Sequence, residues 1–585
     1  MLHELKHIIA DYEQITGHNF KFDLKFLITA GLDFPIDKWT HDSSLLAFNF
    51  PEKIPASWLD AYELERRKQN KSRAVGERHR EAGKYSLKTL APYFLGVEPF
   101  WEAVDHDNDE YAITDAKYTA MLTRQLAERL RNANQKAYQF YQEHHLAWTK
   151  MLLFAELQGI RINLDTLANL ERTTDAELRG AYNTMVDRWA GHFQAYHDLC
   201  VAEIADRYAE MAERAKARNR YSDKIAAQHA RNRLRAEEQI QPLNLDSPSQ
   251  LRWLLTERLG LEAVNLDGEE STDKETLTRL AEQSPDVALL LKYRKAKKLM
   301  TTYYPEYKEM AHNGRIFTSF NSIGTRTGRL SSRGPNLQQV PGALHSVFEA
   351  DPDHVLITRD LSAIEPTVMA YFTEDEKLCE LMLTGGDFHG TNAHAMFNLD
   401  CRPEEVKEAY PRERKIAKEC GLAVLYGAGG NRIYQVLQKQ GMNQYTFTDA
   451  KNFVYRIRDL YSGVWKFKQQ LDKEFEHGAT LHNLLGRPLL FQPEEQQDVY
   501  MQGLNTLVQS SASDLLQHAA YRVWTELNLP VLLLVHDEVV IQAPEAEAAN
   551  LESKIVNILK DFPLPTKHGN IPIKSEGKIS KTWEK

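Results

Sequence analysis

The stretch "LPVLLLVHDEVVIQAP" at residues 529–544 places three polar residues, His536, Asp537 and Glu538, between two apolar runs with the character of buried strands. An ionised carboxylate is costly to desolvate unless it is paired or bound to a metal ion. One interpretation is a hairpin with the polar residues at its turn, although hairpin turns favour glycine and this triplet has none. The other is a functional carboxylate that a buried hairpin holds in place.

A second carboxylate lies in a similar setting, in "HVLITRDLSAIEPTVMAYF" at residues 354–372. This segment predicts an apolar strand that reaches Asp360 and a helix that begins at Glu365 and Pro366. If Asp360 and Asp537 meet about 4 Å apart, their charges repel by roughly 4 kcal/mol at an effective dielectric near 20. Mg²⁺ ions remove that repulsion, and two metal ions between two aspartates serve in-line phosphoryl transfer. Either aspartate alone is ordinary at a strand end.

A basic segment, "PRERKIAKECGLAVLYG" at residues 411–427, supplies groups that could hold a phosphate substrate. On a helix, Arg414 and Lys418 are one turn apart, and Tyr426 lies two turns further along the same side. Like charges at this spacing slightly destabilise a bare helix, but they are favourable where they clamp a polyanion such as a triphosphate. A solvated basic stripe is the alternative interpretation.

The composition predicts a multidomain globular protein that works in a reducing compartment. The chain has 585 residues, 42% hydrophobic and 26% charged, which is too long for one core. Its four cysteines form no CxxC pair, so we expect cytoplasmic localisation without a zinc site or disulfides. No apolar run approaches the roughly 18 residues of a membrane span. The net charge of −10 means that a polyanion must be held by local basic patches.

Taken together, these segments resemble family A DNA polymerases, the polymerase I-like group, on its phage replicative branch. The resemblance covers nearly all of residues 146–585, with the motifs in order. It implies a multidomain α+β fold, a right hand of palm, fingers and thumb, preceded by a partial RNase H-like (DnaQ-type) exonuclease domain. The expected domains are partial exonuclease, thumb, first palm part, fingers and second palm part, at residues 1–135, 136–315, 316–372, 373–500 and 501–585.

Two motifs carry the implied catalytic centre. "DLSAIE" resembles motif A, in which Asp360 and the backbone carbonyl of Leu361 are metal ligands. The same motif assigns Glu365 to selection against ribonucleotides, although Leu361, Ala363, Pro366 and Thr367 depart from the usual pattern. "VHDEV" resembles motif C, in which Asp537 is the second metal aspartate. Motif C also makes Glu538 a candidate catalytic residue and places His536 beside the primer terminus. The implied cofactor is a pair of Mg²⁺ ions, for which Mn²⁺ can substitute.

The incoming nucleotide is assigned to the fingers. "DFHGTNAHAMF" implies that His389 touches the phosphates, and "RKIAKECGLAVLYG" fits motif B, R-x3-K-x7-Y-G. Motif B makes Arg414 and Lys418 triphosphate clamps, with Lys418 also a candidate catalytic residue, and puts Tyr426 in the templating pocket. Leu422 occupies a position that usually carries Phe or Tyr. We therefore expect discrimination against dideoxynucleotides and slow extension.

Primer–template DNA is the expected partner of three further side chains. "TGRLSSRGPNLQQVP" resembles the segment before motif A, in which Arg329 contacts the minor groove. "NTLVQSSASD" resembles the segment in which Asn505 and Gln509 line the nascent duplex. The implied reaction is two-metal transfer of a dNTP to a primer 3′-hydroxyl, in replication of phage DNA within a bacterial host.

The amino-terminal region resembles a 3′–5′ exonuclease that lacks one motif. The matching residues lie in "GHNFKFDLKFL", "THDSSLLAF" and "YAITDAKYT", and they are Asn19, Asp23, Asp42, Tyr111 and Asp115. The first motif, D-x-E, does not occur before Asn19. We expect this chain alone not to degrade primers, and we expect no 5′-nuclease domain. A second polypeptide that completes the domain is favoured over a vestigial domain or an incomplete start.

A basic run at residues 207–239 lies in a helical insertion at about 195–240, before the thumb-like "LNLDSPSQL". Its functional interpretation is a flap over the duplex or a docking site for a processivity factor. A solvated helix pair is the equal alternative. Three rival functions also stay open: a non-catalytic nucleic-acid scaffold, a single-subunit RNA polymerase, and a polymerase that copies RNA. Glu365 and the thumb-like segment speak against the RNA polymerase.

Overall fold

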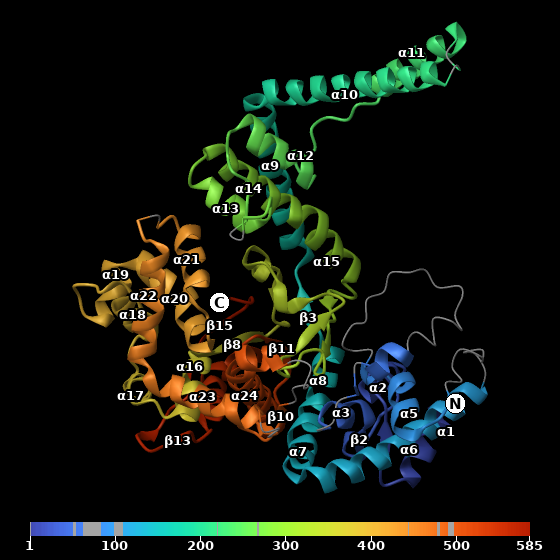
Figure 1. Ribbon diagram of the computed structural model, residues 1–585. Coiled ribbons are helices and arrows are strands. Elements are labelled where there is room, and N and C mark those ends of the chain that lie inside the picture. Colours follow the sequence, from blue (N-terminus) through green and yellow to red (C-terminus); the bar gives the residue numbers. More distant parts are fainter. Residues whose placement is uncertain are drawn as a thin grey trace. The chain divides into compact units, whose positions relative to one another are not determined.

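This computed structural model shows a chain that divides into two compact units (Figure 1). The first unit comprises residues 1–166, 307–428 and 453–585, and the second comprises residues 167–306 and 429–452. The structure describes residues 2–50, 54–55, 57–62, 84–98, 109–218, 220, 222–265, 268–442, 444–476, 480–489 and 496–584. No helix in these ranges is both long enough and apolar enough to cross a membrane.

The core of the first unit is a four-stranded antiparallel sheet in the order β11-β12-β8-β15. Its strands are β8 (His354–Ser362), β11 (Val531–Val535), β12 (Glu538–Pro544) and β15 (Lys574–Ser580). Every residue of β11 is buried, as its unbroken apolar run predicts. Three helices pack against these strands, namely α8 (Leu146–Gln158), α24 (Gln496–Glu526) and α25 (Ala548–Lys560). The opening sequence is therefore a hairpin in a buried sheet, as predicted.

A group of helices follows β8 in the same unit. They are α16 (Ile364–Thr373), α17 (Glu376–Thr384), α18 (Phe388–Phe397), α20 (Pro411–Tyr426) and α23 (Ser462–Glu476), together with the part of α22 (Phe447–Leu460) from Phe453 onward. The predicted helix start at Glu365 and Pro366 is confirmed, since both lie in the first turn of α16. Helix α18 packs along α20, and Gly421 allows this closeness because a Cβ there would lie 2.3 Å from Asn392. This packing brings His389 and Arg414 into one neighbourhood.

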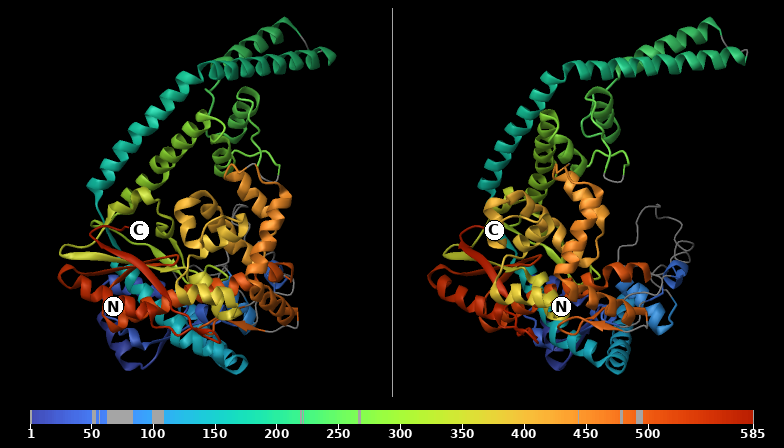
Figure 2. Two further views of the ribbon diagram at one scale, coloured as in Figure 1. Left: turned by 90° about the vertical axis from the view of Figure 1, so that its left-hand side faces the viewer. Right: turned by 60° about the vertical axis from the view of Figure 1, so that its left-hand side comes forward.

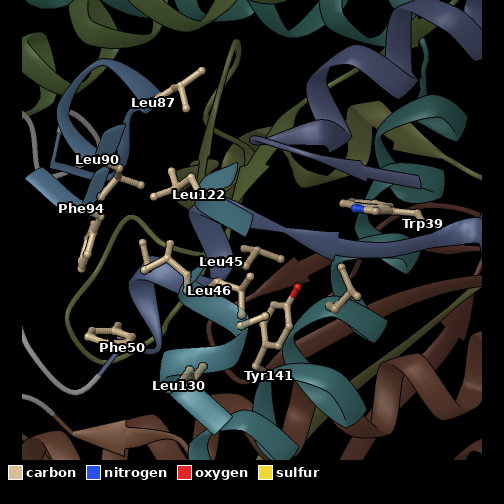
Figure 3. Close-up of a cluster of buried hydrophobic side chains, with 14 of the residues drawn as sticks. Trp39, Leu45, Leu46, Phe50, Leu87, Leu90, Phe94, Leu122, Leu130 and Tyr141 are labelled. Atoms are coloured by element: carbon tan, nitrogen blue, oxygen red, sulfur yellow. The ribbon is translucent and has the colours of Figure 1, made fainter. Parts of the chain in front are cut away.

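The amino-terminal region is built on two short parallel strands, β1 (Ile15–Gly17) and β2 (Trp39–Asp42). The helices around them are α2 (Phe20–Thr29), α3 (Ser43–Phe48), α5 (Leu87–Leu95) and α6 (Asp109–Ala133). A core of leucines and aromatic residues, among them Trp39 and Tyr141, holds these elements together (Figure 3). Among the described strands, β1 and β2 pair only with each other.

A buried ion pair ties this region to the rest of the first unit. Arg487 donates two hydrogen bonds of 2.8 Å to Asp514 on α24, and the side chains are only 2% and 0% exposed. The guanidinium also lies 4.7 Å from the ring centroid of Phe140 and 5.9 Å from that of Trp148. A cation over aromatic rings and against a carboxylate compensates for the lost hydration.

The second unit is almost entirely helical. Its helices include α9 (Leu164–Arg188), α12 (Pro248–Trp253), α13 (Lys274–Ala281), α14 (Pro285–Lys298) and α21 (Gly430–Lys439). Ser247 occupies the N-cap position of α12, and Gly260 follows with φ 64°. Helices α10 (Ala190–Ala217) and α11 (Asp223–Glu238) pack side by side as a hairpin that extends from the other helices of this unit (Figures 1 and 2). We call this hairpin the arm.

Candidate active site

The two aspartates come together at one end of the central sheet. Residues His536 and Asp537 form the turn between β11 and β12, and His536 has φ 56°. The register pairs Glu538 with Asp360, and the backbone N–H of Leu361 donates to the carbonyl of Asp537 over 2.9 Å. The triplet therefore lies at a hairpin turn, and this turn places Asp537 beside Asp360, while the functional role of the carboxylate stays a prediction.

The environment of Asp537 disfavours its ionised form. Burial raises the pKa of Asp537 to about 6, and the carboxylates of Glu365 and Asp360 add to this increase. The guanidinium of Arg329 acts in the opposite direction without outweighing them. A cation at this position would reverse the balance, since positive charge favours the carboxylate form.

These carboxylates fit divalent metal ions. Asp360 and Asp537 offer hard oxygen donors next to each other, which is the chemistry that Mg²⁺ prefers. In the described parts of the chain, no three His, Cys, Asp or Glu side chains are placed to hold a metal ion. The ions would need further oxygens, and in phosphoryl-transfer sites phosphates of the substrate and water supply them. Asp360 and Asp537 are therefore the residues that would hold metal here.

Glu538 has a buried hydrogen-bond partner of its own. It is 3% exposed, and its Oε1 accepts a 2.9 Å hydrogen bond from the indole Nε1 of Trp583. The structure gives Glu538 an anchoring contact, and its predicted catalytic role stays a prediction.

Glu365 links three of the sequence motifs. One carboxylate oxygen accepts from Arg329 over 2.5 Å, and the other accepts from the hydroxyl of Tyr426 over 2.7 Å. Burial and the charge of Glu365 hold the pKa of Tyr426 well above its usual range, so this hydroxyl stays a hydrogen-bond donor. The predicted minor-groove, sugar-selecting and template-pocket residues thus form one hydrogen-bonded group.

A second group lies on the facing helices α18 and α20. Arg414 donates from Nε and Nη2 to the two carboxylate oxygens of Asp387, over 2.8 and 2.9 Å. Burial and the charges of Arg414 and Lys418 lower the pKa of His389 to about 4. The buried Nδ1 of His389 has no hydrogen-bond partner in the protein. His389, Arg414 and Lys418 are therefore neighbours, as the motifs predict.

Asp387 was not among the predicted site residues. Its carboxylate caps α18 by accepting from the backbone N–H of His389, in addition to holding Arg414. Burial opposes ionisation of Asp387, but the hydrogen bonds of Arg414 outweigh it and the pKa is lowered. The sequence held a signal, since an aspartate immediately before a helix is a common cap.

Three further predicted residues are half-buried near these groups. Leu422 lies on α20 between Lys418 and Tyr426 and is neither fully buried nor exposed. Asn505 and Gln509 are one turn apart on α24, and the buried Oδ1 of Asn505 has no hydrogen-bond partner. Their predicted contacts with nucleotide and duplex stay predictions.

The exonuclease-like residues are brought together only in part. Asn19, Asp23, Tyr111 and Asp115 line one cavity of about 960 Å³. Asp42 is 1% exposed and acts as a capping residue instead. Its carboxylate accepts from the backbone N–H groups of Asn19, Phe20, Ser44 and Leu45 and from the Ser44 hydroxyl. The prediction did not foresee this use of Asp42, because a motif match does not show where a side chain points.

Comparison with known proteins connects this geometry to a family. The sequence profile described as DNA polymerase family A matches residues 215–585. DNA polymerase I of Helicobacter pylori is 30% identical over 357 residues, which cover 58% of this chain and 38% of that protein. The thermostable DNA polymerase I of Thermus aquaticus is 30% identical over 363 residues, covering 58% and 42%. The matches thus span about two fifths of the length of these relatives.

A solved structure shares the fold over almost the whole chain. It is the POL domain of Pol1 from M. smegmatis, in complex with DNA primer-template and dNTP. The TM-score is 0.73 at 22% identity, and the alignment covers 99% of this chain and 88% of that chain. The expected helix-rich α+β polymerase fold is therefore confirmed. The domain boundaries drawn from the sequence stay predictions.

Proposed function

This chain belongs to DNA polymerase family A, and we propose that it extends a DNA primer along a template by adding deoxynucleotides. The observation that carries the proposal is the pairing of β12 with β8, which sets Asp537 beside Asp360. The Arg329–Glu365–Tyr426 group lies next to these aspartates, since Arg329 and Glu365 act on the pKa of Asp537. A pair of carboxylates beside a guanidinium, in a chain that also has a basic group on α18 and α20, suits nucleotidyl transfer.

In this proposal the two aspartates hold the divalent ions. When bound, Mg²⁺ or Mn²⁺ ions would lower the pKa of the primer 3′-hydroxyl and neutralise charge on the triphosphate. We assign Asp360, Asp537 and the Leu361 carbonyl to that role. Glu538 positions the hairpin through its hydrogen bond with Trp583. Because Asp537 has a pKa of about 6, it is largely ionised at neutral pH even before a cation binds.

The second group, on the facing helices α18 and α20, binds the incoming nucleotide. Arg414 and Lys418 supply positive charge, and His389, neutral at physiological pH, donates a hydrogen bond to a phosphate oxygen. Glu365 occupies the space of a ribose 2′-hydroxyl and thereby selects dNTPs, while Tyr426 supports it. Leu422 covers the nucleotide without an aromatic face.

Duplex DNA is held by residues on three other segments. Arg329 reaches the minor groove, Asn505 and Gln509 line the nascent duplex, and His536 lies beside the primer terminus. The unpartnered Oδ1 of Asn505 supports this assignment, because a buried acceptor without a partner is costly until a ligand satisfies it.

The test is a gel assay with a 5′-labelled primer on a longer DNA template, with Mg²⁺, with and without dNTPs. We expect extension by the native chain, and no extension by Asp360→Asn or Asp537→Asn variants that still bind the duplex. Extension by both variants at the rate of the native chain would overturn the assignment. Binding without any extension by the native chain would favour the scaffold function. A parallel RNA template tests the RNA-copying alternative.

For the amino-terminal region we propose that this chain alone does not trim primers. Asp42 is engaged by backbone donors, and besides Asp23 and Asp115 the cavity is lined by Glu156, whose carboxylate is held by Lys21 and Lys25. Phe22 and Phe26 on α2 are 56% and 62% exposed, which suits strands added by a further polypeptide. Mg²⁺-dependent shortening of the primer without dNTPs by the purified chain would contradict this proposal.

The biological setting follows from the resemblance. We propose replication of phage DNA in the cytoplasm of a bacterial host, and a role for the insertion at 195–240 in retaining the polymerase on its template, through DNA or a processivity factor. Product length per binding event, with and without residues 207–239, measures that role. Unchanged length would favour a merely solvated helix pair.

A further inference from the structure

A lysine of the amino-terminal region reaches the strand that precedes the Arg329 loop. Lys21 lies on α2, and its ammonium donates a hydrogen bond of 2.5 Å to the backbone carbonyl of Phe320, in β5 (Ser319–Asn321). Glu156 on α8 accepts from the backbone N–H of Phe320 over 2.7 Å, and the same carboxylate oxygen pairs with Lys21. One ion pair therefore holds both backbone groups of a single strand residue. We call Lys21 and Glu156 the support pair.

The support pair is buried against a strand that has only one neighbour. The side chains of Lys21 and Glu156 are 13% and 3% exposed. Burial lowers the pKa of Lys21, and the charge of Glu156 opposes this change. Among the described strands, β5 pairs only with β6 (Ser331–Arg333), and Phe320 lies opposite Ser332. The support pair thus takes the place of a third strand, because it satisfies backbone groups that would otherwise be buried without partners.

Attachment of the amino-terminal region does not by itself explain an ion pair at this position. The hydrophobic core of this region already includes Leu146 and Leu153 of α8, and the Arg487–Asp514 pair adds a second connection. Apolar side chains of similar volume would hold the same interface, since a buried ion pair loses its hydration. Hydrogen bonds are directional, however, so the support pair fixes where β5 lies as well as holding it.

The loop that β5 leads into carries an arginine of the candidate active site. Residues 322–330 contain no helix or strand, and Arg329 near their end donates to Glu365. The far part of the loop is held by α24, since the carbonyl of Gly328 accepts from the side-chain amide of Gln517 over 3.3 Å. A loop that is fixed at both ends has fewer conformations. The support pair therefore restricts the positions that Arg329 can take.

We propose that the support pair positions Arg329 and thereby helps Glu365 to select deoxynucleotides. The inference rests on the proposed DNA synthesis and deepens it, because it gives the amino-terminal region a role in nucleotide addition that needs no nuclease activity. The support pair acts through Phe320 and the loop, so its members are positioning residues and not catalytic ones. If Arg329 shifts, one carboxylate oxygen of Glu365 loses its donor, and the carboxylate no longer closes the space of a 2′-hydroxyl as firmly.

The test compares three variants of the full chain. Lys21→Met removes the ammonium and keeps most of the apolar stem, while Lys25, 3.4 Å from the other oxygen of Glu156, still offsets its charge. Lys21→Arg keeps the positive charge, and the cavity of about 960 Å³ that Lys21 lines has room for the larger side chain. Lys88→Met is the matched control, because Lys88 lines the same cavity but lies 5.7 Å from the ring centroid of Tyr111. Circular dichroism and thermal unfolding check that all three variants fold.

The first readout is the preference for dNTPs over rNTPs, measured as the ratio of kcat/KM values for single-nucleotide addition. This ratio does not depend on the fraction of active protein, so a merely structural defect leaves it unchanged. Lys21→Met should reduce the ratio about three- to tenfold, the size of effect expected when a residue acts through others. Lys21→Arg should keep most of the native ratio, and Lys88→Met should keep all of it.

The second readout needs no catalysis. Hydrogen–deuterium exchange of peptides that span residues 319–333 is followed in the protein without DNA. In Lys21→Met these amides should exchange faster than in the native chain, because Phe320 has lost one of its two anchors. Peptides from α25 should exchange at the native rate and are the internal reference.

An unchanged nucleotide preference in Lys21→Met would overturn the inference, even with faster exchange, since the support pair would then be a structural contact only. An equal reduction in Lys88→Met would also overturn it, because any loss of charge in the cavity would have the same effect. A Lys21→Arg variant as impaired as Lys21→Met would exclude a role of the positive charge. If the native chain adds no nucleotide, the proposed function fails separately, and unchanged exchange in Lys21→Met would still refute the support of β5.

Discussion

Arg414 and Asp387 face each other across α18 and α20, joined by two parallel hydrogen bonds of 2.8 and 2.9 Å. The bidentate contact uses two of the five N–H groups of the guanidinium and fixes its plane. The three remaining N–H groups therefore point in defined directions. The pair thus presents Arg414 in a fixed orientation next to His389 and Lys418.

We predict that Asp387 positions Arg414 for the triphosphate. Asp387→Ala should raise KM for dNTPs about tenfold, a loss of about 1.4 kcal/mol, with a smaller effect on kcat. Steady-state kinetics of single-nucleotide addition measure both. Asp387→Asn, which retains the cap of α18 and one acceptor, should have a KM for dNTPs between those of the native chain and Asp387→Ala. A lower KM for Asp387→Ala would show instead that the carboxylate competes with substrate.

Ionised Asp537 should lower the free energy of unfolding at neutral pH. Its folded pKa is raised from 3.8 to about 6. Stability that this group contributes is therefore present below pH 3.8 and lost as the pH rises through 6. Asp537→Asn should then increase the free energy of unfolding at pH 8 in EDTA, by up to about 3 kcal/mol.

Denaturant unfolding at pH 8 and pH 4 measures this effect. The difference in free energy of unfolding between the native chain and the Asp537→Asn variant should nearly vanish at pH 4. Mg²⁺ should stabilise the native chain more than the variant. At limiting Mg²⁺, DNA synthesis by the native chain should fall as the pH drops below about 6, because protonation of Asp537 competes with binding of the cation. A less stable Asp537→Asn variant at pH 8 would refute this account.

Sugar selection should depend on the hydrogen bonds to Glu365. Glu365→Ala should reduce the preference for dNTPs over rNTPs by roughly 10- to 100-fold, since it opens the space for a 2′-hydroxyl. Tyr426→Phe should reduce it less, because Arg329 still holds one carboxylate oxygen. Competition between the two nucleotide types in primer extension gives the ratio. Unchanged selection in Glu365→Ala would remove Glu365 from this role.

Leu422 should limit the use of dideoxynucleotides. Leu422→Tyr places an aromatic ring in the nucleotide pocket and should increase dideoxynucleotide incorporation relative to dNTPs several-fold or more. The frequency of chain termination at a fixed ratio of the two nucleotides measures it. Leu422→Met, which keeps the volume without a ring, is the control. No gain with tyrosine would contradict the prediction.

The Arg487–Asp514 pair should stabilise the first unit because both charges are buried. Asp514→Ala should cost about 3 to 5 kcal/mol of unfolding free energy, since it leaves an unpaired buried guanidinium. The same measurement on Glu526→Ala, which breaks an exposed pair with Arg522, should show at most about 1 kcal/mol. Similar losses for both variants would mean that burial does not decide the contribution of Asp514.

The candidate residues of the proposed centre could be identified from the linear order of residues. Asp360 and Asp537 could be found because each interrupts an apolar run, and a carboxylate in such a setting needs a partner. The helix start at Glu365 and the helix that carries Arg414 and Lys418 followed from proline, charge and spacing. These features are local, so the amino-acid sequence contains them.

Which side chains share an environment depended on the tertiary fold. The pairing of β12 with β8, the bond from Trp583 to Glu538 and the contact of Asp387 with Arg414 join residues between 27 and 190 positions apart. Motif spacing cannot report such contacts, because they depend on strand register, on which face each residue takes, and on how helices pack. That is why the sequence could propose Glu538 and Asp42 as site residues, while packing gave them an anchoring and a capping contact.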